Sequence, residues 1–208
     1  MKSVFYDWGG INVWLFHLIN DIRFEWLDKL MLLGTSLGDH TRFPLYLSLL
    51  TLFSVFIVNK GALDDKRHRI QVNNWMLVIS VFSIAYLFNG LLLGYLKPLL
   101  DFSRPLLALP IGTVNVVGQP EYHHSLPSGH SSFAMLITAS FWPVLNKRWR
   151  WVFAVFLLWV GISRVSLGAH FPADVMAGFL SSLAVVLLVQ KFTGKLLSVW
   201  VAKQGTSA

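Results

Sequence analysis

Long apolar stretches, separated by short charged segments, make up most of this chain of 208 residues. The apolar stretches cover residues 43–59, 73–96, 129–146, 151–167 and 172–190. A helix needs about 20 mainly apolar residues, and at least about 17, to cross the hydrocarbon core of a bilayer. Each stretch reaches the lower figure. The pattern therefore predicts an all-α fold, a polytopic transmembrane helix bundle with about five to six membrane helices.

The first 40 residues have a mixed character. Residues 11–19 are apolar, but Asn20, Asp21 and Arg23 interrupt the run. Residues 24–37 are amphipathic. This pattern fits one or two helices lying in the membrane interface, or a first span packed against its neighbours, and it does not decide between them. We expect an N-terminal amphipathic segment (1–40), a transmembrane core (41–192) and a cytoplasmic tail (193–208).

Composition supports a membrane protein. Hydrophobic residues make up 55% of the chain and charged residues 13%, which is about half the charged fraction of a soluble domain. The formal net charge is +7. In a membrane protein such an excess favours contact with the cytoplasm and with anionic membrane lipids over binding of nucleic acid. Cysteine is absent, which excludes disulfides and thiolate chemistry.

The basic residues also predict an orientation. If the five spans are real, the basic segments 60–71 and 147–150 and the basic C-terminal tail fall on one side of the membrane. The positive-inside rule makes that side cytoplasmic. Segments 97–128 and 164–173 then share the opposite face. We expect a multi-pass protein of a bacterial inner membrane, with these two segments facing the periplasm.

Segment 97–128, which is rich in Pro and Gly, is predicted to be a long loop, and it begins with a pair of cations, Lys97 and Arg104. Phosphate needs several charge-assisted donors, and Arg can supply two parallel hydrogen bonds while Lys supplies a compact charge. Pro105 disfavours helical geometry at Arg104. The alternative is that both side chains simply extend to the polar surface at the end of a span, with Asp101 pairing with one of them.

The same segment ends in Pro127-Ser128-Gly129-His130. Ser128 is suited to cap the helix that follows, and Gly129 permits close backbone approach. A helix N-terminus offers free N–H groups and a positive dipole to an anion. His130 would lie beside that anion and could give a proton to a departing oxygen. The alternative is an ordinary capped helix with a surface histidine.

The third group consists of Arg164, His170 and Asp174. Pro172 fits the first turn of a new helix, which also contains Asp174. A carboxylate bonded to one imidazole nitrogen fixes the tautomer and leaves the other nitrogen free to attack. Arg164 would add a phosphate donor. The alternative is a His–Asp pair that only stabilises a helix start.

Together the three groups resemble the tripartite signature of the type 2 phosphatidic acid phosphatase superfamily, over roughly residues 73–190. The spacing matches: six residues separate Lys97 from Arg104, five separate Arg164 from His170, and three separate His170 from Asp174. The resemblance implies that His170 attacks phosphorus and forms a phosphohistidine, that Asp174 orients it, and that His130 protonates the leaving oxygen. The implied ligands of the phosphoryl oxygens are Lys97, Arg104, Ser128, Gly129 and Arg164.

The resemblance also implies a hydrolase that needs no metal or other cofactor, because the cationic side chains stabilise the phosphoryl oxygens. The sequence offers no cluster of carboxylates for a two-metal site. His123 and His124, near Glu121, are better explained as loop polarity than as a metal site, although they could contact a substrate headgroup.

The expected function is a membrane lipid phosphatase. Its first candidate substrate is a polyprenyl diphosphate, followed by phosphatidylglycerol phosphate, phosphatidic acid and lipid A phosphates. Three other functions remain open: a lipid phosphotransferase using the same site, a transport or assembly protein without catalysis, and a vanadate-dependent haloperoxidase, whose known relatives are soluble. The sequence does not indicate an oligomeric state.

Overall fold

The computed structural model describes residues 6–61 and 65–205, and the regular secondary structure within these ranges is helical, with no strand. The α-helices are α2 (Ile11–Asn20), α3 (Glu25–Leu37), α4 (Phe43–Asn59), α5 (Lys66–Leu100), α6 (Pro105–Ala108), α7 (Gly129–Phe141), α8 (Lys147–Ser166) and α9 (Pro172–Gly205). Short 3-10 helices cover Trp8–Gly10 (η1), His40–Arg42 (η2) and Trp142–Val144 (η3).

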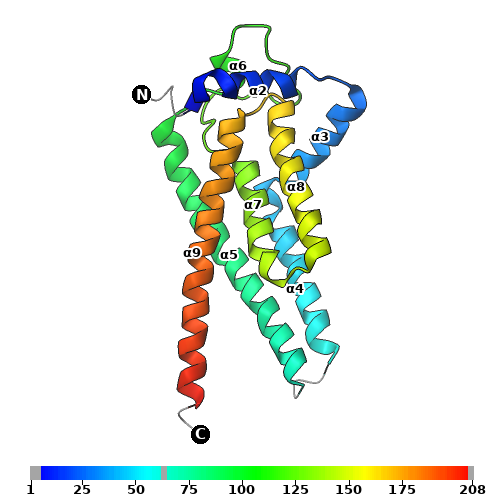
Figure 1. Cartoon of the computed structure of the whole chain (residues 1–208), viewed down its shortest axis with the longest axis vertical. Coiled ribbons are helices and arrows are strands. Elements are labelled where there is room, and N and C mark those ends of the chain that lie inside the picture. The colour runs from blue at the N-terminus through cyan, green and yellow to red at the C-terminus, as the bar shows by residue number, and fades with distance from the viewer. Residues whose placement is uncertain (1–5, 62–64, 206–208) are drawn as a thin grey trace.

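Four helical segments in the described part of the chain are long and apolar enough to cross a membrane. These segments are His40–Asn59, Lys66–Ala108, Lys147–Ser166 and Pro172–Lys195. In Figure 1, α5 and α9 run along most of the molecule, and α2 lies across one end of the bundle, near α6 and the loop that follows it. The fold is the transmembrane helix bundle that the sequence predicts.

Helix α7 forms the centre of the bundle, packed against α5, α8 and α9. Its 13 residues span only about 20 Å, less than the hydrocarbon core. The helix is therefore shorter than the predicted span 129–146. Pro143 lacks the N–H that would bond the carbonyl of Ala139, and the side chain of Gln190 donates to that carbonyl instead at 3.1 Å. The helix therefore ends inside the bundle with this carbonyl satisfied.

Helix α5 is longer than the predicted span 73–96. It begins at Lys66, where the Asp65 side chain accepts a hydrogen bond from the Arg67 N–H at 3.0 Å. It continues through Pro98 and stops at Asp101, whose φ of 38° is left-handed. Lys97 therefore lies on the last turn of a membrane helix rather than in a loop.

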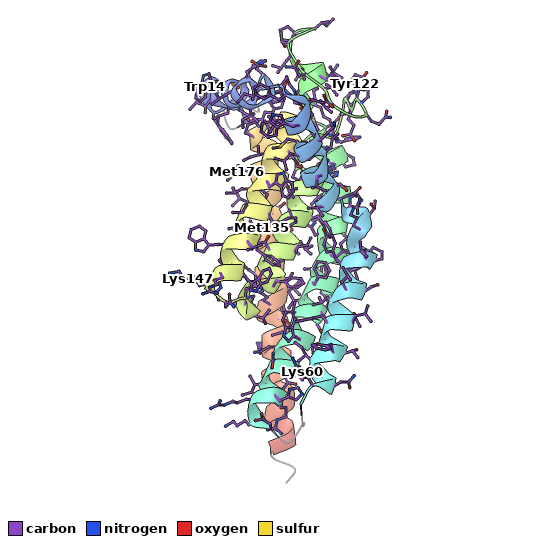
Figure 2. The ribbon with its side chains drawn as sticks, turned by 90° about the vertical axis from the view of Figure 1, so that its right-hand side faces the viewer. Trp14, Lys60, Tyr122, Met135, Lys147 and Met176 are labelled. Atoms are coloured by element: carbon purple, nitrogen blue, oxygen red, sulfur yellow. The ribbon has the colours of Figure 1, made fainter. Side chains whose placement is uncertain are left out.

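Helix α2 has two distinct faces. Asn12, Phe16 and Asn20 are buried against the bundle, whereas Ile11 and Trp14 are exposed. Figure 2 shows Trp14 at the same end of the molecule as Tyr122, with Lys60 at the opposite end. An apolar outer face on a helix that lies across the bundle fits a helix in the membrane interface.

Candidate active site

The three groups of residues from the sequence meet at the end of the bundle that α2 covers (Figure 1). Three helix N-termini and two helix C-termini supply them. Lys97 and Arg164 lie in the last turns of α5 and α8, and Arg104 directly precedes the first residue of α6. Ser128, Gly129 and His130 begin α7, and His170 and Asp174 flank the start of α9.

His170 and Asp174 form a buried pair. The Nδ1 atom of His170 lies 3.5 Å from Oδ2 of Asp174, and both side chains are almost completely buried. Two further donors reach the same oxygen, the Ser125 hydroxyl at 2.5 Å and the Phe171 N–H at 2.9 Å. These contacts hold the carboxylate beside the imidazole.

Arg104 lies on the other side of the His170 ring. Its Nη1 atom is 3.2 Å from Nε2 of His170. It is fixed by the carbonyls of His123, at 2.9 Å from Nε, and Ala169, at 3.2 Å from Nη1. A guanidinium can only donate, so Nε2 carries the lone pair and the ring proton is on Nδ1, toward Asp174. This is the tautomer that a nucleophile needs.

The electrostatic surroundings keep this imidazole neutral. Burial lowers the pKa of His170 well below its ordinary value, and the positive charges of Arg164, Arg104 and Lys97 lower it further. An unprotonated ring is therefore maintained in a site that is rich in positive charge.

The start of α7 forms a second wall of the site. The Ser128 side chain accepts hydrogen bonds from the N–H and hydroxyl of Ser131, at 3.5 and 3.0 Å. The Ser128 N–H donates to the Asp174 carbonyl at 3.0 Å, which ties α7 to α9. The Nζ atom of Lys97 lies 3.9 Å from where a Cβ would stand on Gly129. An anion at this helix start would meet both backbone donors and an ammonium group.

A polar cavity of about 240 Å³ borders His130, Arg164, Thr35 and Glu121. Arg164 donates from Nη1 to the Thr35 hydroxyl at 2.6 Å, while its buried Nε finds no partner among the described residues. Glu121 forms an ion pair with Arg104. The carboxylate of Glu121 thus lies among the cations that the sequence suggests for phosphate.

Lys97 and Gly129 line a separate, mainly apolar cavity of about 400 Å³. Its walls include Leu93 and Gly94 of α5 and Phe133 of α7. This arrangement places a space suited to hydrocarbon next to the cationic centre.

All eight residues suggested by the sequence are therefore brought to one end of the bundle. The sequence did not single out Ser125, Glu121, Thr35 or Tyr6. Ser125 and Glu121 lie in the segment predicted to share the catalytic face, which was the available signal. Tyr6 and Thr35 come from the N-terminal 40 residues, where no local pattern indicates a site.

His123 and His124 both approach a single carboxylate. Their Nδ1 atoms are 3.6 and 3.3 Å from Oδ1 of Asp101. The described residues contain no group of three or more His, Asp or Glu arranged to hold a metal ion.

A model of the PAP2 superfamily matches residues 74–197 of this chain. Among curated proteins, a lipid A 1-phosphatase of Rhizobium johnstonii is 33% identical over 50% of this chain and 43% of its own length. Phosphatidylglycerophosphatase B of Bacillus subtilis is 29% identical over 84% of this chain and 79% of its own length. The undecaprenyl-diphosphatase BcrC of Bacillus subtilis is 30% identical over 50% and 52%. The match to the lipid A 1-phosphatase thus covers less than half of that relative.

Two solved structures share the fold. LpxE of Aquifex aeolicus superposes with a TM-score of 0.70 at 23% identity, covering 87% of this chain and 95% of its own. A transmembrane PAP2-type phosphatidylglycerolphosphate phosphatase of Bacillus subtilis superposes with a TM-score of 0.66 at 25% identity, covering 90% and 86%. Both superpositions cover more of this chain than the family model does, so each includes residues before position 74.

Proposed function

This chain belongs to the PAP2 superfamily, and from that premise we propose that it is a lipid phosphatase acting through a phosphohistidine at His170. It is a multi-pass membrane protein, and the described part of the chain contains four long apolar helical segments. The observation that carries the proposal is the arrangement of His170, with Asp174 on the Nδ1 side and Arg104 beside Nε2. Binding of phosphate alone would not require an oriented, unprotonated imidazole.

The proposed reaction has two displacements. Nε2 of His170 attacks the terminal phosphorus, the bond from that phosphorus to the ester oxygen of a monophosphate or the bridging oxygen of a diphosphate breaks, and His130 gives its proton to the departing oxygen. Water, deprotonated by His130, then attacks the phosphohistidine, the phosphorus–nitrogen bond breaks, and inorganic phosphate leaves. Lys97, Arg104, Arg164 and the N–H groups at the start of α7 would stabilise charge on the phosphoryl oxygens, without a metal ion.

The substrate class we propose is a lipid phosphate or diphosphate. The apolar cavity beside Lys97 and Gly129 supports a hydrocarbon tail, and the relatives are named for lipid substrates. A polyprenyl diphosphate is the first candidate, before phosphatidylglycerol phosphate, phosphatidic acid and lipid A. We place the protein in a bacterial inner membrane with this end of the bundle at the periplasmic face, from the distribution of basic residues.

The test is phosphate release by the purified protein in detergent, with a strong chelator present, from each of these four lipids. We expect release from at least one lipid and none from His170→Ala. His68→Ala is the matched control, because His68 lies at the far end of α5, beside the carbonyl of Val58. It should keep full activity.

A substrate labelled in its phosphoryl group tests the proposed phosphohistidine. We expect an acid-labile phosphoprotein that is absent in His170→Ala. Loss of activity on chelation, restored by a divalent ion, would exclude the metal-free mechanism. Folded protein that releases no phosphate but passes it to an added lipid would identify a phosphotransferase instead.

A further inference from the structure

The Asp174 carboxylate has a partner that comes from the other end of the chain. Its Oδ2 atom accepts from Ser125 and Phe171. Its Oδ1 atom accepts from the hydroxyl of Tyr6 at 2.7 Å, across 168 positions of sequence. Tyr6 lies outside the residues that the family model matches.

Aromatic contacts hold Tyr6 in place. Its ring centroid is 4.4 Å from that of Phe102 and 6.0 Å from that of Phe171. In the sequence, Phe102 lies between Lys97 and Arg104, and Phe171 directly follows His170. Burial and the adjacent Asp174 raise the pKa of the Tyr6 phenol, so the hydroxyl keeps its proton and acts as a donor. The ring fixes the position of the hydroxyl, and the hydroxyl contacts the carboxylate.

Helix α2 attaches this segment to the same region. The Asn12 side chain accepts from the Ala173 N–H at 2.9 Å, one residue before Asp174. The Asn20 side chain donates to the carbonyls of Asn115 and Ser166, at 2.8 and 2.9 Å. These buried amides hold α2 against the start of α9 and against the segments around Asn115 and Ser166, so the chain that follows Tyr6 is fixed beside the candidate site.

We propose that Tyr6 is a positioning residue for the reaction, donating to Oδ1 of Asp174 so that Oδ2 faces Nδ1 of His170. This inference rests on the proposed function, in which Asp174 orients the attacking imidazole. It makes segment 6–20 part of the catalytic unit rather than a separate amphipathic appendage. A carboxylate anchored at one oxygen only could rotate and lose its alignment with the imidazole.

Tyr6→Phe is the decisive variant, because it removes the hydroxyl and keeps the ring between Phe102 and Phe171. We expect kcat to fall roughly tenfold, the order expected for one hydrogen bond to a charged group, with KM changed less than about twofold. Tyr95→Phe is the matched control, since Tyr95 is 68% exposed on α5. A kcat within about twofold of the native value in Tyr6→Phe would overturn the proposal. A rise in KM together with a lower unfolding temperature would also overturn it, in favour of a purely structural role.

A second readout does not depend on turnover. In protein labelled with ¹⁵N at histidine, we expect the Nδ1–H resonance of His170 to shift in Tyr6→Phe and not in Tyr95→Phe. An unchanged resonance would count against Tyr6 even if no lipid is hydrolysed. Absence of hydrolysis by the native protein, with the shift present, would contradict the proposed function and leave the positioning contact supported.

Discussion

The carboxylate of Glu121 occupies the region where we propose that the phosphoryl group binds. It pairs with Arg104 and borders the same polar cavity as Arg164 and His130. A phosphoryl group needs the same N–H donors, so substrate must displace this carboxylate. We therefore expect Glu121→Gln to tighten the binding of phosphate-like anions.

The size of the effect follows from the geometry of the pair. Two unit charges about 4 Å apart attract by about 4 kcal/mol near a protein surface and about 1 kcal/mol in water. The Glu121 side chain is 49% exposed, against 8% for Arg104, so solvent screens much of the attraction. If displacing the Glu121 carboxylate costs about 1–2 kcal/mol, removing its charge should raise the affinity for a phosphate-like anion roughly 5–30-fold.

The assay is inhibition of lipid hydrolysis by vanadate, which can mimic the five-coordinate phosphoryl species. We expect the inhibition constant of Glu121→Gln to be about 5–30-fold lower at low salt, with a smaller difference at high salt. Glu25→Gln is the control, because Glu25 is exposed on α3 and pairs with Lys29. An inhibition constant that is unchanged or higher in Glu121→Gln would refute the competition, and a large fall in kcat would show instead that Glu121 helps to hold Arg104 in place.

Two further predictions concern packing and pH. A Cβ on Gly178 would lie 2.6 Å from the Ser128 carbonyl oxygen, so Gly178→Ala must push α9 away from the start of α7. We expect it to lose about 1–3 kcal/mol of stability and several-fold in kcat, measured by thermal unfolding and phosphate release. A Cβ on Gly194 would meet nothing within 4 Å, so Gly194→Ala should lower neither the stability nor kcat. Equal behaviour of the two variants would contradict this packing argument. The second prediction uses the lowered pKa of His170, whose ordinary value is 6.5. Below about pH 6.5 the unfolded chain binds more protons at this residue than the folded protein does, so its contribution to stability is present above that pH and is lost as the pH falls. The unfolding temperature of the native protein should therefore drop more between about pH 7.5 and pH 5 than that of His170→Asn, and parallel curves would disprove the assignment.

Local sequence predicted much of the fold because apolar length and helix signals are local properties. The uncharged run 43–59 matches α4, and Pro172 begins α9 as expected. Pro143 was a local signal that the helix starting at Gly129 ends before residue 146, but the contact that satisfies its last turn was not predictable in this way. Gln190, 51 positions away, donates to the Ala139 carbonyl that Pro143 leaves without a partner. Such a contact exists only after α9 has packed against α7.

The candidate site likewise combines residues that local sequence predicted with residues that only the structure reveals. The roles of His130, His170 and Asp174 were suggested by residue type and spacing, and the fold brings these residues to one end of the bundle. Tyr6 and Thr35 could not be found from sequence, because each is joined to the site only by a hydrogen bond to a side chain more than 120 positions away, Asp174 and Arg164 respectively. The N-terminal 40 residues appeared separate from the signature, yet their side chains contact two of its members.

The short length of α7 has a consequence for how the protein is assembled in the membrane. A helix of 13 residues cannot hold itself across a bilayer that requires about 20. Longer segments such as α5, α8 and α9 can insert independently, but α7 becomes stable only when they close around it. We therefore expect the helix that carries Ser128 and His130 at its start to depend on α5, α8 and α9 for its place in the bundle. The proposed phosphate-binding residues at its start then depend on packing within the bundle rather than on the membrane, so loss of that packing would remove the site while the longer helices stay inserted.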